Sequence, residues 1–150
     1  MQRRDLLAIA AVGAALASVE NVVAQTGGAT PRARLIRIYT KSNGDSAVED
    51  VEISPSAGPI PVTHMTAGGY GGAARPPAWH NAPRRQFAIN MTGDLEVELT
   101  GGGRRKIGAG DLVYLEDVTG QGHVTRALGP VTNLFIHVAD DFDVVAWARG

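Results

Sequence analysis

The sequence contains no cysteine among its 150 residues. This absence excludes disulfide bonds, a thiolate nucleophile, and any zinc or iron–sulfur site that depends on cysteine ligands. Aromatic residues are also scarce, at 5% of the chain. Any chemistry must therefore come from the four histidines, the carboxylates, the amides or the hydroxyl groups.

The chain has no excess of charge of either sign and no basic run. Its 14 lysines and arginines face 15 acidic residues, which leaves a formal net charge of −1. Binding to nucleic acid or to an anionic membrane surface depends on clustered Lys and Arg side chains, so neither partner is predicted. The length is that of one domain and is too short for two full hydrophobic cores.

The apolar stretch near the N-terminus is too short to cross a membrane as a helix. Residues 6–19 are apolar, rich in alanine and uncharged, but a membrane span needs about 20 residues. Arg3 and Arg4 precede this stretch and small residues follow it near Ala24, which is the order of an export signal. The paired arginines resemble a twin-arginine signal of bacteria.

We therefore predict an export signal peptide over residues 1–24 and a mature protein located in the periplasm or outside the cell. An Ala-rich cytosolic helix or a short membrane anchor is the alternative. Residues 25–32 are then a flexible N-terminal segment, and residues 33–150 form the folded domain.

The mature chain is predicted to be almost entirely β structure. Its dense Gly and Pro residues leave no 12-residue window with apolar residues at helical spacing, and over the whole sequence 15 valines and 8 isoleucines outnumber 10 leucines. Nine short strands suit a sandwich or a closed barrel. They are expected at residues 33–40, 48–54, 60–66, 86–91, 95–100, 104–107, 111–115, 122–127 and 131–138.

Three local patterns give more detailed expectations. In residues 95–99, Leu and Val alternate with Glu96 and Glu98, so the glutamates should face solvent opposite the basic residues 104–106 across a hairpin. Phe87, Ile89 and Met91 should form one packed face of a strand. The glycine-rich run at residues 67–74 is expected to be a loop, because it does not open a helix as a phosphate-binding turn must.

Polar residues with catalytic potential gather in two segments, residues 79–86 before one strand and residues 116–123 after another. The first resembles the first motif of the cupin superfamily, which is His-x-His, three or four residues, Glu, six residues, Gly. His80 takes the first His position, Gln86 the Glu position, and Gly93 follows after six residues. Ala82 stands where the second His is expected.

The second segment resembles the second cupin motif, which is Gly, five residues, Pro-x-Gly, two residues, His. Gly110 opens the match and His123 closes it, with two extra residues and no proline. The resemblance covers roughly residues 79–138. It implies an all-β fold, a single cupin-type double-stranded β-helix or jelly-roll barrel, in a family that includes oxygenases, isomerases, epimerases, lyases and binding proteins.

A complete cupin site holds a divalent metal with three imidazoles and one carboxylate. This chain offers two imidazoles and an amide, so the resemblance implies either no cofactor or a weakly held Fe, Mn, Ni or Zn ion at His80, Gln86 and His123. The corresponding alternative function is a metal-dependent cupin dioxygenase or another oxidoreductase. A non-catalytic cupin that binds a small ligand is a further alternative.

The same pocket can transfer protons without a metal, because an imidazole both takes and returns a proton near neutral pH. His123 is the expected base, with Glu116 or Asp117 orienting its ring through the second nitrogen. The preferred function is therefore a small-molecule enzyme that uses acid–base chemistry, as an isomerase, lyase or cyclase would.

Other residues are expected to assist. Gln86 and His80 would donate to a developing oxyanion, and Arg84 would clamp a substrate carboxylate, unless it forms a surface salt bridge. Trp79 and Tyr114 are predicted to line the substrate pocket or the core, and Asp117 is also assigned to the pocket.

Two expectations concern residues outside the motifs. His64 and His137 are expected to be structural. The expected partner is a small organic substrate. A homodimer could also form if two chains exchange the strand at residues 33–40 or pair it edge to edge.

Overall fold

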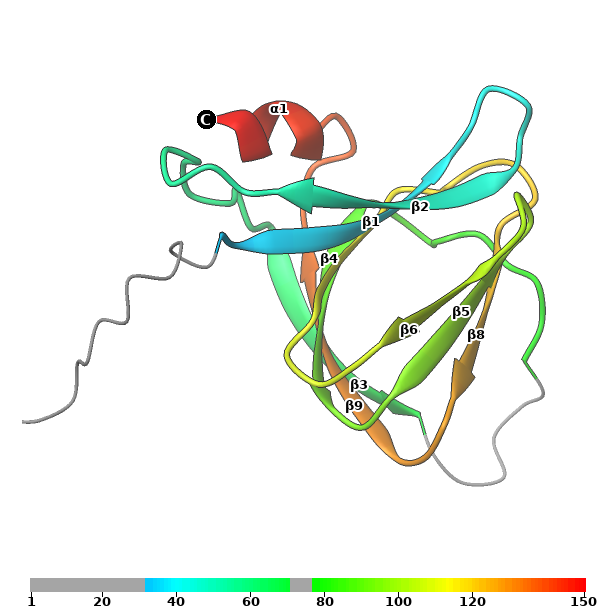
Figure 1. Ribbon diagram of the computed structural model, residues 1–150. Helices are drawn as coiled ribbons and strands as arrows, with labels where there is room; N and C mark the ends of the chain where they lie inside the picture. The colour runs from blue at the N-terminus through cyan, green and yellow to red at the C-terminus, as the bar shows by residue number, and fades with distance from the viewer. Residues whose placement is uncertain (1–31, 71–76) are drawn as a thin grey trace, which may run out of the picture. The chain divides into compact units, whose positions relative to one another are not determined.

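In the computed structural model, residues 32–70 and 77–150 are described, and they form nine strands and one short helix (Figure 1). All nine predicted strands are present, with ends that shift by up to four residues. The predicted signal peptide and nearly all of the predicted flexible segment lie outside the described residues. The elements are β1 (Arg34–Thr40), β2 (Ser46–Glu52), β3 (His64–Tyr70), β4 (Gln86–Thr92), β5 (Leu95–Leu99), β6 (Arg104–Ile107), β7 (Leu112–Leu115), β8 (His123–Ala127), β9 (Val131–His137) and α1 (Val144–Arg149).

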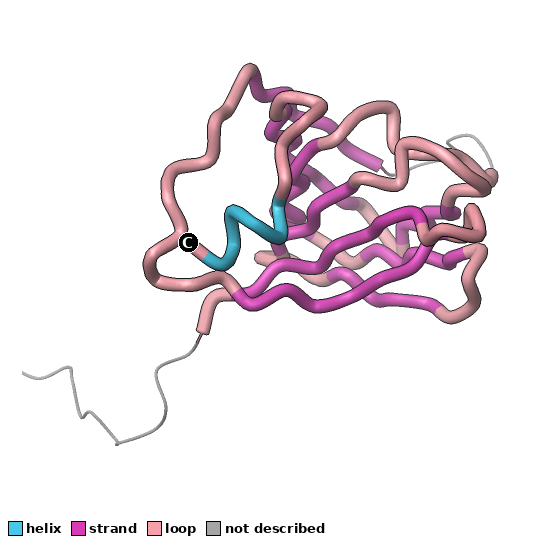
Figure 2. The backbone as a smooth tube through the Cα atoms, turned by 90° about the horizontal axis from the view of Figure 1, so that it is seen from above, coloured by secondary structure: helices cyan, strands magenta, loops and turns pink. Residues whose placement is uncertain are grey.

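The strands form two sheets that face each other. One has six strands in the order β2-β1-β7-β4-β9-β3, and the other has three in the order β6-β5-β8. Paired strands run antiparallel, except that β1 joins β7 in parallel. Figure 2 shows the two layers of strands in the view from above. The fold is the all-β, two-sheet barrel that the cupin resemblance implies.

The main hydrophobic core fills part of the space between the sheets. On β5, Leu95, Val97 and Leu99 are buried while Glu96 and Glu98 are partly exposed, as the alternation predicts. Both glutamates pair with Arg104 of the neighbouring strand β6. The charged face is confirmed, although Arg105 lies opposite Val97 and reaches across to Asp50 of β2 instead.

A second core covers the outer face of the six-stranded sheet. Phe87 and Tyr114 pack there against each other. Phe87 also contacts Trp147 of α1, and Tyr114 contacts Phe142, which precedes the helix. The prediction that Phe87, Ile89 and Met91 form one packed face is wrong at Met91, which is 56% exposed and lies where the pairing of β4 with β9 shifts register.

Helix α1 has only six residues, and the apolar spacing of the sequence did not predict it. The feature of the sequence that marks this helix is its N-cap residue, Asp143, and not an apolar periodicity. The Asp143 carboxylate accepts hydrogen bonds from the backbone N–H groups of Val145 and Ala146. Within the described residues, no helix has the length and apolar character needed to cross a membrane.

The glycine-rich run at residues 67–74 was expected to be a loop, but its first four residues belong to β3. A Cβ at Gly68 would lie 3.0 Å from Cε2 of Phe135, so glycine leaves the space that this ring occupies. The rest of the run, from residue 71, lies outside the described residues.

The strand at residues 33–40, the candidate for exchange in a dimer, is not an edge strand, and the exchange itself stays a prediction. Strand β1 pairs with β2 on one side and β7 on the other, so its backbone groups are already used within the chain. The edges of the six-stranded sheet are β2 and β3.

Candidate functional site

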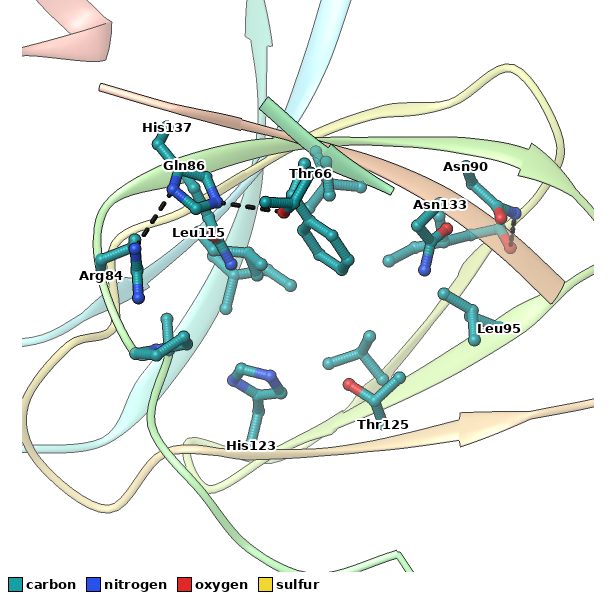
Figure 3. Close-up of a pocket in the computed structure, with 18 of the residues that line it drawn as sticks. Thr66, Arg84, Gln86, Asn90, Leu95, Leu115, His123, Thr125, Asn133 and His137 are labelled. Carbon is teal, nitrogen blue, oxygen red and sulfur yellow. Dashed lines mark hydrogen bonds between the residues drawn. The ribbon is translucent and has the colours of Figure 1, made fainter. Parts of the chain in front are cut away.

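A cavity of about 470 Å³ lies between the two sheets, and all four histidines of the chain line it. This volume suits a small organic molecule. Figure 3 shows two of these histidines, His123 and His137, on the cavity wall. Side chains from both sheets and from the segment before β4 contribute to the wall. The polar lining residues are His64, Thr66, His80, Arg84, Gln86, Asn90, His123, Thr125, Asn133 and His137.

His80 and His123 lie side by side, although 43 positions separate them in the sequence. Their backbones exchange two hydrogen bonds of 2.9 Å, and their ring centroids are 4.6 Å apart. Gly122 permits this approach, since a Cβ there would lie 2.2 Å from the carbonyl oxygen of His80. The prediction that His80 and His123 face one hollow is confirmed, since both line the cavity.

His123 is held from behind by a buried carboxylate. Its Nδ1 lies 2.6 Å from Oδ2 of Asp117, and the two residues are 3% and 0% exposed. The Ser46 hydroxyl donates to the same oxygen at 2.8 Å. Because Nδ1–H donates to Asp117, neutral His123 keeps the lone pair on Nε2 free.

Of the two carboxylates expected to orient His123, Asp117 is the one that does so. Glu116 points to the other side of the sheet and accepts a hydrogen bond of 2.6 Å from Nε of Arg37. Asp117 does not itself line the cavity, so its assignment to the substrate pocket is wrong. It lies behind the imidazole, where it fixes the ring.

The ring of His80 has a defined tautomer as well. Its Nδ1 lies 2.9 Å from the carbonyl oxygen of Ala78, which can only accept, so Nδ1 carries the proton. Neutral His80 therefore has an acceptor at Nε2. It cannot donate to an oxyanion unless it is protonated, which leaves Gln86 as the neutral donor of the pair.

Arg84 and Gln86 share the inward face, as their parity predicts. Gln86 is 5% exposed, and within the described residues its side-chain amide has no hydrogen-bond partner. Arg84 donates from Nη1 to Nδ1 of His137 at 3.2 Å and forms no ion pair with a described carboxylate. The neighbouring Arg85 forms a salt bridge instead. Its Nη1 donates to the Phe142 carbonyl and lies 3.9 Å from Oε2 of Glu116.

His64 and His137 were expected to be structural, but both line the cavity. They are register partners on β3 and β9, with ring centroids 4.0 Å apart and a contact between Nε2 of His64 and Nδ1 of His137. Arg84 can only donate, so Nδ1 of His137 is an acceptor and its proton is on Nε2. Burial, followed by the positive charges of His64 and Arg84, lowers the pKa of His137 below 6.5.

The other two residues predicted for the pocket are elsewhere. Trp79 is 50% exposed and does not contribute to the described cavity wall. Tyr114 lies in the core on the outer face of the sheet, where its hydroxyl donates to the Phe142 carbonyl at 3.2 Å. Burial raises the pKa of Tyr114 to about 12, with a smaller contribution from the Glu116 carboxylate.

The described residues do not reproduce a four-ligand cupin metal site. His80 and His123 each leave an Nε2 lone pair free, and the Gln86 amide oxygen is a weak neutral third ligand. No group of three or more His, Asp or Glu side chains in residues 32–70 and 77–150 is arranged to hold a metal ion. The Arg84 guanidinium on the cavity wall further disfavours a cation.

The comparisons with known proteins add two solved structures. Protein NMB1881 of Neisseria meningitidis aligns with 16% identity and a TM-score of 0.36, over 74% of this chain and 90% of its own. Ethanolamine utilization protein Q (EutQ) of Salmonella typhimurium LT2 aligns with 15% identity and a TM-score of 0.40, over 75% of this chain and 100% of its own. No protein-family model matches the chain, and no curated protein matches it.

Proposed function

We propose that the protein binds a small organic acid in the barrel cavity and catalyses proton transfer on it, as an isomerase, lyase or cyclase does. The buried Asp117–His123 pair carries this proposal. It presents a fixed imidazole with a free Nε2 lone pair to a cavity of suitable size.

In this scheme, His123 removes a proton from the substrate through Nε2. The imidazolium that forms keeps its Nδ1–H bond to the Asp117 carboxylate, whose negative charge stabilises it at 2.6 Å. The same nitrogen then returns the proton to a different atom of the substrate, which completes an isomerisation, or to a leaving group, which completes an elimination.

The substrate would be oriented by Arg84 and Gln86. Arg84 has guanidinium N–H groups that no described carboxylate occupies, so they can hold a substrate carboxylate. Gln86, on the first position of β4, can donate its free amide N–H to the oxygen that gains charge as the proton leaves.

Deuterium exchange tests the proposal across a range of candidate substrates. The folded protein is incubated in D₂O with a panel of small keto acids, hydroxy acids and arylacetates, and deuteration at carbon is followed by NMR. We expect exchange for at least one acid, with a rate about a hundredfold lower in His123→Gln. Asp117→Asn should also lose rate, while Met65→Leu, an exposed position facing outward, should not.

Two outcomes would contradict the proposal. Exchange that survives in His123→Gln would assign the base to another residue. Acids that bind but never exchange would instead identify a non-catalytic ligand-binding barrel.

The oxidoreductase alternative rests on the two free Nε2 atoms of His80 and His123. Elemental analysis of protein purified without added metal or chelator separates it from proton transfer. Stoichiometric iron, manganese or nickel that is lost in both His80→Gln and His123→Gln would favour the metal-dependent enzyme. Metal below a tenth of an equivalent in active protein would favour the metal-free scheme.

We also propose that the mature protein is exported and acts outside the cytoplasm, on the evidence of the N-terminal signal pattern. A homodimer is proposed only through the edge strands β2 or β3, since β1 is paired on both sides.

A further inference from the structure

The end of the cavity opposite the histidines carries two buried amides. Asn90 and Asn133 are register partners on β4 and β9, they line the cavity, and they are 1% and 3% exposed. Figure 3 shows both on one side of the cavity, with Arg84, Gln86 and His137 on the other side. The cavity therefore has two polar ends.

The two amides differ in how much of their hydrogen bonding the protein satisfies. Asn90 donates from Nδ2 to the carbonyl oxygens of Gly93 and Ile107, which holds the turn after β4, and only its Oδ1 lacks a partner. Oδ1 of Asn133 is likewise buried without a partner, and its Nδ2, on the cavity wall, forms no hydrogen bond with a described residue. A buried amide that is neither paired nor structural calls for a partner that the protein itself does not supply.

The wall between the two ends is apolar. Ala88 on β4 and Phe135 on β9 lie between the polar positions of their strands, and Leu95 and Val97 face them from β5. The Phe135 ring lies over Gly68, whose missing side chain lets the ring approach the backbone of β3. This part of the cavity suits a planar apolar group.

The separation of the two ends sets the length of the ligand. His137 and Asn133 are four residues apart on β9, about 13 Å along an extended strand. Hydrogen bonds of about 2.8 Å at each end leave about 7 Å between the two polar groups of the ligand. A carboxylate and a hydroxyl on opposite positions of a six-membered ring are separated by this order of distance.

We propose that the ligand is a carboxylate with a ring-sized apolar body that ends in a hydroxyl group, and that Asn133 is the residue that recognises this hydroxyl. A hydroxyl group both donates and accepts, so it can satisfy both the oxygen and the nitrogen of the Asn133 amide, whereas an aromatic amine donates but is a poor acceptor. This inference depends on the part of the proposed function in which Arg84 binds the substrate carboxylate. It does not depend on the proposed proton transfer.

Calorimetry with 4-hydroxyphenylacetate as the probe tests the proposal, with phenylacetate and 4-methoxyphenylacetate as comparisons. We expect the hydroxylated acid to bind at millimolar concentration or below. The two comparison acids should bind about tenfold more weakly, because a neutral hydrogen bond in a buried site has about that effect on affinity.

Variants assign the effect to Asn133. Asn133→Leu should remove the difference between the hydroxylated acid and phenylacetate, and should keep or raise the melting temperature because an unpaired amide is replaced by an apolar side chain. Thr132→Leu also replaces a polar side chain by leucine, at the adjacent exposed position, where it removes a hydrogen bond of 2.7 Å with Thr92, and it should keep the tenfold difference.

Equal affinities for the three acids in the unaltered protein would refute the inference, as would no binding of the hydroxylated acid at millimolar concentration. Tighter binding of 4-aminophenylacetate than of the hydroxylated acid would refute the hydroxyl assignment. These results are independent of the deuterium-exchange rates, so the inference and the proposed function can fail separately.

Discussion

Gly122→Ala is the substitution that most directly tests the meeting of His80 and His123. Gly122 has a φ of 75°, and a Cβ built there would lie 2.2 Å from the carbonyl oxygen of His80 and 2.5 Å from the carbonyl carbon of His80. An ordinary contact needs about 3.4 Å, so the His80 segment would have to move by about 1 Å. A shift of that size breaks the two 2.9 Å hydrogen bonds between His80 and His123.

The expected cost is the sum of two effects. A non-glycine residue at positive φ costs about 1 kcal/mol, and the two lost backbone hydrogen bonds cost about 1 kcal/mol each. The free energy of unfolding should therefore fall by about 3 kcal/mol. The imidazole of His80 should also leave the neighbourhood of His123, while the contact between His123 and Asp117 is kept.

Gly103→Ala is the matched control. Gly103 has a φ of 89°, but a Cβ there meets nothing within 4 Å, so the substitution adds backbone strain without a clash. Chemical denaturation of both variants measures the difference, and the histidine side-chain NMR signals report on the ring contact. Equal losses of about 1 kcal/mol, with the His80 and His123 signals unchanged in Gly122→Ala, would refute the geometry on which the site depends.

Three further predictions concern other parts of the chain. Asp143→Ala removes the cap of α1 and should lower the free energy of unfolding by about 1 kcal/mol, measured by denaturation, and an unchanged value would show that the helix is held by packing alone. Because the folded state lowers the pKa of His137, the unfolded chain binds more protons below pH 6.5, so stability should fall on acidification from about pH 7.5 to about pH 5.5. His137→Gln should reduce this dependence in thermal melts, and an identical pH profile would contradict it. Replacing Arg3 and Arg4 by lysine should retain the protein inside bacterial cells, as fractionation would show, and unimpaired export would exclude the twin-arginine route.

The fold was predictable where a strand has one buried face. Leu95–Leu99 alternates strictly, and the structure places it as expected with Glu96 and Glu98 outward. In β3, the glycine residues carry no hydropathy pattern. Glycine is needed at position 68 because the Phe135 ring, distant in the sequence, packs against it. Information of that kind is absent from the local sequence, because it depends on the register between β3 and β9.

The candidate site was predictable only in the two segments that resemble the cupin motifs. His80, Gln86, Arg84 and His123 were all expected, and all line the cavity. His137 was assigned to the sheet because it ends an apolar run, and nothing in residues 134–138 shows which side chains face inward. The pairing of Asn133 with Asn90, and of His137 with Gln86, fixes that face and brings both residues into the site.

The distribution of charge across the cavity gives the proposed reaction a direction. Arg84, His64 and His137 are held by the six-stranded sheet and the segment leading into it, and burial, followed by the charges of His64 and Arg84, lowers the pKa of His137. The Asp117 carboxylate lies behind His123, on the side of the three-stranded sheet. An organic acid that enters the cavity places its carboxylate against Arg84. This orientation turns the carbon-bound protons of the acid towards Nε2 of His123. Removal of such a proton creates negative charge near Gln86 and positive charge on His123, and the latter is next to a buried carboxylate that can stabilise it. The same asymmetry explains why a divalent cation is poorly placed here, since Oδ2 of Asp117 is held by His123 and Ser46 behind the imidazole, and the Arg84 guanidinium lies on the cavity wall itself.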